Sequence, residues 1–172
     1  MDHQAHHPAQ SGKHGTAHDG SSARAYWMFA LNLALSLIPM YLAMFTMIDG
    51  WRDYRNNVNM LYMALTMLAP MGVIMLATMG KMYGNKPLNL ALYAGLTVLF
   101  LASLLATRRQ ALVDDRQFID SMIPHHSGAI LMCREAKLAD PELLRLCGEI
   151  VKAQRAEIEQ MEVIAARLRA QK

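Results

Sequence analysis

Long uncharged stretches alternate with short polar ones over the first two thirds of the chain. Residues 26–48, 56–80 and 87–107 carry no formal charge and are 23, 25 and 21 residues long. A helix needs about 20 apolar residues to cross the hydrocarbon core of a bilayer. Aromatic residues lie near the ends of these runs, where amphipathic rings favour the headgroup level. The pattern predicts three transmembrane helices, the first being an anchor rather than a cleaved leader.

Beyond the membrane region the pattern changes to helical periodicity with many charges. It predicts one helix from about Asp115 to Lys137 and another from Pro141 to near Arg169, started by an Asp-Pro-Glu signal. In the second helix Gln154 and Glu157 interrupt an apolar stripe spaced by three and four residues. An antiparallel hairpin would place Glu157 level with Met122 and Gln154 level with His125. We therefore predict an all-α fold.

The chain divides into three parts by composition. Residues 1–25 have few apolar side chains and are predicted to be a disordered tail, followed by the membrane region at 26–107 and a hairpin domain at 114–168. The tail histidines are either simply solvated or weak accessory metal sites; the candidates are His3, His6 and His7.

The charge distribution excludes a nucleic-acid partner. The formal net charge is +3, but the segment after Gln110 holds ten acids and nine bases, so the excess positive charge flanks the apolar runs instead of forming a basic face. Four Lys or Arg lie on each side of the predicted membrane region, so the positive-inside rule leaves the orientation open.

The segment around Pro124 carries the candidate chemistry. On a helix Met122, His125 and His126 are neighbours, and Met132 lies about two turns beyond His125. Thioethers and neutral imidazoles favour a soft, singly charged cation, which indicates Cu(I) with Ag(I) as its mimic. Gln154 and Glu157 would orient the imidazoles. The alternative is that the methionines pack the core and the histidines are structural.

No motif predicts an enzyme. Di-iron bundles use Glu-x-x-His on facing helices, and this sequence contains no such motif.

The hairpin resembles the domain-of-unknown-function family 305. The resemblance rests on Phe118-x-x-x-Met122-Ile-Pro-His-His-x-x-Ala129-Ile-x-Met132, followed by Asp140-Pro-Glu-Leu, Gln154, Glu157-Ile and Met161. It implies a ferritin-like helical bundle that binds copper or silver in the bacterial periplasm or envelope. Carried over by residue, the implied metal ligands are Met122, His125, His126, Met132 and Met161.

Two departures from the family pattern change the expectation. Many members resemble a tandem of two hairpins, whereas this chain has one, so we predict a homodimer that completes a four-helix bundle. The second departure is Cys133, at similar height to Cys147 in the predicted hairpin. We expect two free thiols; Cys133 as an auxiliary copper ligand is the next option, and a bridge requires favourable side-chain directions.

Methionines also line the membrane runs. Seven on the second run are spaced by three or four residues, and three on the first run are spaced in the same way: Met60, Met63, Met67, Met71, Met75, Met79 and Met82, with Met40, Met44 and Met47. Such faces either pack the helices or form a thioether path for a metal ion.

The sequence therefore predicts a multi-pass protein of the bacterial inner membrane that binds Cu(I) for copper or silver tolerance or handling, with the hairpin in the periplasm. The alternative is a membrane interaction or sensing protein whose hairpin holds no metal.

Overall fold

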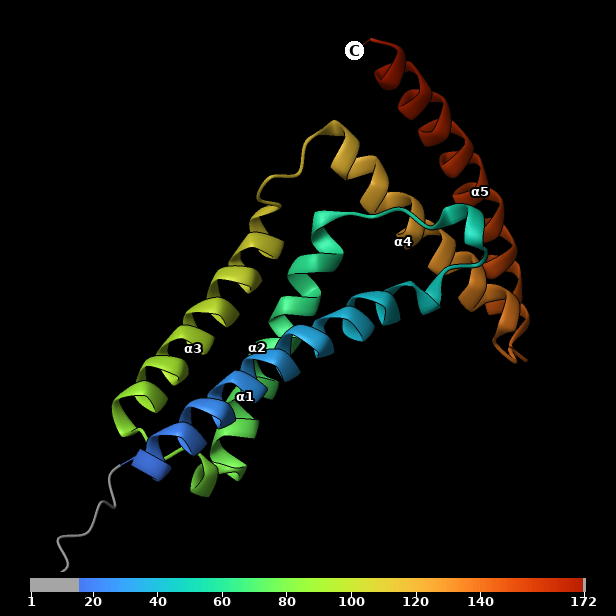
Figure 1. Cartoon of the computed structure of the whole chain (residues 1–172). Helices are drawn as coiled ribbons and strands as arrows, with labels where there is room; N and C mark the ends of the chain where they lie inside the picture. Colours follow the sequence, from blue (N-terminus) through green and yellow to red (C-terminus); the bar gives the residue numbers. More distant parts are fainter. Residues whose placement is uncertain (1–15, 172) are drawn as a thin grey trace, which may run out of the picture.

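The computed structural model describes residues 16–171, with side chains from Ala23 onward, and no strand occurs among them. The five long helices are α1 (Thr16–Ala43), α2 (Val58–Thr78), α3 (Lys86–Arg109), α4 (Asp115–Glu135) and α5 (Pro141–Ala170). Three short 3-10 helices, η1 (Met44–Met47), η2 (Trp51–Asp53) and η3 (Gly80–Met82), lie in the connections of the membrane region. The predicted all-α fold is confirmed (Figure 1).

The three predicted spans are also confirmed. Ala23–Met47, Val58–Thr78 and Lys86–Arg109 are long and apolar enough to cross a membrane. The boundary of the tail differs from the prediction, because α1 begins at Thr16 and not near residue 26. Once a helix has been nucleated, each further residue adds one hydrogen bond without the cost of a new nucleus. The apolar helix can therefore extend by a turn or more into the polar residues that precede it.

Small residues bring α2 and α3 close together. Ala64, Ala69 and Gly72 are buried on α2, and a Cβ added at Gly72 would lie 3.0 Å from a methyl carbon of Leu96. The Thr66 hydroxyl also donates a 2.9 Å hydrogen bond to Oγ of Ser103 across the two helices. Close backbone approach and interhelical hydrogen bonds are the usual means of packing helices in lipid.

The methionine faces of the first two spans do not close on each other. Met47, Met63, Met67, Met79 and Met82 are exposed, while the other five of the ten are partly buried. Along the described spans the structure therefore does not gather the methionines into one buried path.

The hairpin lies across the ends of the spans (Figure 1), where α4 contacts η1, η2 and the start of α2. Its own core consists of Ile119, Ile123 and Ile130 of α4 against Ile158 of α5. Asp114 and Asp140 cap the two helices by accepting from the backbone N–H groups of Gln117 and Leu143. The predicted helix pair and the start signal at residue 140 are confirmed.

Pro124 creates the main link between the hairpin and the membrane region. Proline has no N–H, so the carbonyl of Asp120 loses its partner within the helix. Asn57, a 5% exposed residue that precedes α2, donates from Nδ2 to this carbonyl at 3.2 Å. Its Oδ1 accepts from the N–H of Met60 at 2.9 Å and caps α2. The Asn57 side chain thus caps the start of α2 and also gives the Asp120 carbonyl the hydrogen-bond donor that it lacks within α4.

Ser127 and Gly128 form a second link with the connection between α1 and α2. The Ser127 side chain is fully buried; its hydroxyl accepts from the N–H of Asp49 at 2.7 Å and donates to the Asp53 carboxylate. A Cβ at Gly128 would lie 3.0 Å from the carbonyl oxygen of Met47. Only glycine allows this approach without a backbone shift.

We predict that Asn57→Ala lowers the free energy of unfolding by about 1–3 kcal/mol, because it removes a helix cap and leaves a buried carbonyl without a partner. Asn85→Ala is the matched control, since Asn85 caps α3 through the N–H of Leu88 and is exposed. Chemical denaturation in detergent measures both variants. Equal losses would contradict the role of Asn57 in holding α4.

Candidate metal centre

His126 faces the interior of the hairpin. It is 9% exposed, and its Nδ1 lies 3.0 Å from Oε2 of Glu157 on α5. The N–H does not align with the oxygen, so the contact is electrostatic rather than a hydrogen bond. Burial lowers the pKa of His126 below its usual value; Glu157 acts in the opposite direction and His125 adds to the lowering. Burial therefore favours the neutral imidazole, the form that binds metals.

The register of the hairpin brings two methionines to one level. Glu157 faces His126 instead of Met122, one helical turn from the predicted register. The guanidinium of Arg116 donates to the carbonyl of Leu168 at 2.8 Å, which agrees with this shifted register. Met122 lies one turn before His126 and Met161 one turn after Glu157, so these methionines are level in the antiparallel pair. Met161 packs against the isoleucine core.

The other candidate ligands of α4 belong to a face that no described element fully covers. At 100° per residue the members of this outer face fall within an arc of about 80°; they are Phe118, Met122, His125, Ala129 and Met132. Phe118 is 53% exposed and Met132 60% exposed. Ten residues of helix separate Met122 from Met132 by about 15 Å, so one chain cannot place both on the same ion.

Acidic and nitrogen ligands alone do not build a metal site in this hairpin. Among the side chains described from Ala23 onward, no three of His, Cys, Asp or Glu lie close enough together to hold an ion. His125 and His126 have ring centroids 6.0 Å apart and point in different directions from α4. Any ion at His126 would therefore need sulfur from the methionines beside it.

A family model described as "Domain of unknown function (DUF305)" matches residues 97–165. The uncharacterized protein L153 of Acanthamoeba polyphaga mimivirus is 30% identical to this chain over 140 residues, which cover 80% of this chain and 90% of that protein. The chain belongs to the DUF305 family. The aligned 140 residues exceed the matched domain by far, so the likeness to the viral protein includes part of the membrane region. No solved structure matches the chain.

The centre of the DUF305 motif has a role in this structure that its residue pattern did not predict. Pro124, Ser127 and Gly128 attach α4 to the connection between α1 and α2 through Asn57, Asp49 and Met47. The sequence contained a signal for this role. Serine and glycine after a proline have low helix propensity, so their presence inside a predicted helix indicates that a tertiary contact requires them.

The cysteines correct the expectation of free thiols. Cys133 and Cys147 form a disulfide with Cα atoms 5.3 Å apart, so Cys133 is not an auxiliary metal ligand in this state. The sequence predicted the two positions at similar height. Near the hairpin loop the helix axes lie close enough to bring the two Cα atoms within the distance that a disulfide requires.

The remaining candidates have separate outcomes. Gln154 is partly buried on α5, and its predicted role in orienting an imidazole stays a prediction. His3, His6 and His7 lie outside the described residues.

We predict that the purified DUF305 protein contains no free thiol without reductant. Replacing both cysteines by serine should lower the free energy of unfolding of the hairpin by about 3 kcal/mol, since the disulfide closes a loop with a separation of 14 residues. Maleimide labelling of the unfolded protein, followed by mass measurement, tests the first point, and denaturation tests the second. Two labelled thiols in the untreated protein would refute the bridge.

Proposed function

We propose that this protein is a membrane-anchored carrier of Cu(I), with Ag(I) as a chemical mimic, that serves copper or silver tolerance or handling. It stores, buffers or hands on the ion. The observation that carries the proposal is the buried His126, whose Nδ1 lies 3.0 Å from Oε2 of Glu157 without forming a hydrogen bond to a described residue, which leaves Nε2 as the nitrogen that would bind the ion. This is the arrangement of a ligand imidazole held from behind by a carboxylate.

The donor set around His126 suits a soft monovalent ion. Met122 and Met161 supply thioether sulfur at the same level, whereas His125 lies on the outer face, away from this set. Thioethers bind hard cations poorly, so the set discriminates against Mg²⁺ and Ca²⁺. The Glu157 carboxylate would balance the single positive charge of Cu(I). A small rotation of the His126 imidazole would turn its contact with Glu157 into a hydrogen bond.

The outer face of α4 supports the proposal of a homodimer. Phe118, His125 and Met132 are exposed there, and Leu143 and Leu146 are exposed near the start of α5. A second copy of the hairpin would bury these side chains in a four-helix bundle and place Met132 near donors of the other chain.

The disulfide supports the proposed orientation. Disulfides persist on the oxidising side of a membrane and are rare in the cytosol. The hairpin and the connection between α1 and α2 would then face the periplasm of a bacterium, with the spans in the inner membrane and the connection between α2 and α3 in the cytoplasm.

We expect His126→Gln and Met122→Leu each to weaken Cu(I) binding at least about tenfold, because each removes one donor from a small set. Met67→Leu is the control, since Met67 is an exposed methionine of α2. Competition with a coloured Cu(I) chelator gives the affinities. Equal affinities in all four proteins would place the ion elsewhere, and no binding by the native chain would favour an interaction or sensing module.

Mass measurement in detergent should give twice the chain mass of 19.3 kDa after correction for bound detergent. Phe118→Asp should return the protein to a monomer, because it puts a charge into the middle of the proposed interface. Leu112→Asp is the control, since Leu112 is exposed outside the hairpin. A monomeric native protein would exclude the dimer. The proposal that the protein binds Cu(I) would then be tested by the chelator titration alone.

A further inference from the structure

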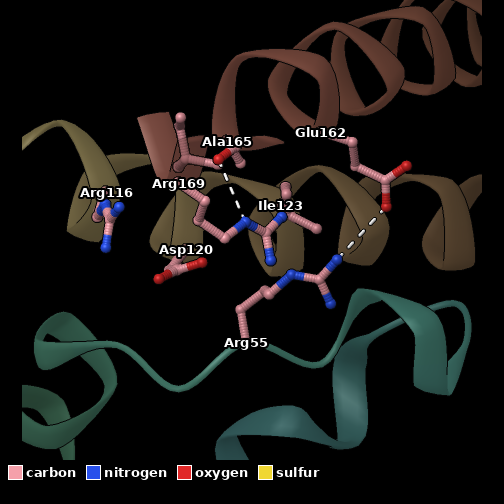
Figure 2. A pocket seen from close by; sticks show the side chains of 8 residues that line it. Arg55, Arg116, Asp120, Ile123, Glu162, Ala165 and Arg169 are labelled. Carbon is pink, nitrogen blue, oxygen red and sulfur yellow. Dashed lines mark hydrogen bonds and ion pairs between the residues drawn. The ribbon is translucent and has the colours of Figure 1, made fainter. Parts of the chain in front are cut away.

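A small cavity on the opposite side of the hairpin from the outer face is surrounded by arginines from three elements. It has a volume of about 140 Å³ and lies between Arg55 of the connection before α2, Arg116 and Asp120 of α4, and Glu162 and Arg169 of α5. Figure 2 shows Arg55 and Arg169 pointing into this space from opposite walls. The volume is several times what one water molecule requires.

Backbone carbonyls hold each guanidinium in place. Arg116 donates to Leu168 at 2.8 Å, Arg169 donates from Nε to Ala165 at 3.2 Å, and Arg55 donates to Arg52 at 2.6 Å. These contacts use only some of the five N–H donors of each group. Among the described residues neither Arg116 nor Arg169 forms an ion pair, so both have donors available for a ligand.

The two carboxylates of the cavity play different parts. Glu162 is paired with Arg55 at 3.4 Å. Asp120 is half-buried and accepts no hydrogen bond from a described side chain, although three guanidinium groups surround it. With three cations against two anions, the cavity favours an anion that can also donate a proton to a carboxylate.

We propose that this cavity binds a protonated phosphate group, either free phosphate or the phosphomonoester headgroup of phosphatidic acid. Planar guanidinium groups match the geometry of phosphate oxygens. Inorganic phosphate keeps a P–OH donor for Asp120 at neutral pH, and a phosphomonoester carries one at and below about pH 6, where its second proton dissociates. Sulfate has no such proton, so its oxygens would repel the Asp120 carboxylate. Arg55 lies only three residues before the span of α2, within reach of lipid headgroups.

The test uses the full-length protein in detergent. Calorimetric titration with inorganic phosphate and with sulfate should show phosphate binding at least about tenfold more tightly. Arg169→Gln and Arg55→Gln should each weaken phosphate binding about tenfold. Arg167→Gln is the matched control, because Arg167 lies in the same last turn of α5 but does not line the cavity, and it should change phosphate binding less than about twofold. Asp120→Asn should bring the sulfate affinity to within about threefold of the phosphate affinity.

Native mass spectrometry from mixed micelles distinguishes the two sources. Retention of phosphatidic acid over phosphatidylcholine, lost in Arg169→Gln, identifies the lipid headgroup; saturable inorganic phosphate without lipid retention identifies free phosphate. The proposal is wrong if neither binds, if Arg167→Gln and Arg169→Gln weaken binding equally, or if Asp120→Asn leaves the preference for phosphate over sulfate unchanged.

Discussion

The carbonyl that Pro124 frees is the constraint on which the arrangement of the hairpin depends. A buried carbonyl without a partner costs about 1–3 kcal/mol, so a proline inside α4 is tolerable only where another donor reaches it. Asn57 provides that donor from the first residue before α2, and it is itself fixed by capping that helix. The position of α4 is therefore set relative to the start of a membrane span. The contacts of Ser127 and Gly128 one turn later fix the rotation of α4 about its axis.

This fixed rotation gives α4 three faces with separate tasks. One face, with Asp120, Ser127 and Gly128, packs on the connection between the first two spans. A second face carries isoleucines and His126 against α5. The third is the outer face, where His125 and Met132 are exposed and no element among the described residues covers them. Two consecutive histidines therefore lie in different environments, because a helix turns about 100° per residue. The paired histidines of the motif are not equivalent donors.

Much of the fold could be predicted from the sequence because its signals are local. Three uncharged runs, an Asp-Pro-Glu start and a 3.6-residue period each depend on a few neighbouring residues, and the structure has the corresponding elements. The register of the hairpin could not be fixed in this way, since a shift by one turn keeps the same apolar faces in contact. The disulfide could not be predicted either, because it depends on the distance between the two helices. The role of Asn57 depended on a contact between residues 63 positions apart, which no periodicity reveals.

The same constraint explains why His126 is a better candidate ligand than a histidine on a flexible segment. A flexible segment must lose backbone and side-chain freedom when it wraps an ion, and this cost offsets part of the binding energy. His126 has lost that freedom on folding, because Pro124 and Ser127 on either side are already attached to the membrane connection and Glu157 stands behind the ring. A donor set held in this way can bind an ion with little further ordering. The docking of α4 on the membrane region therefore holds His126 in the orientation that the proposed metal site requires.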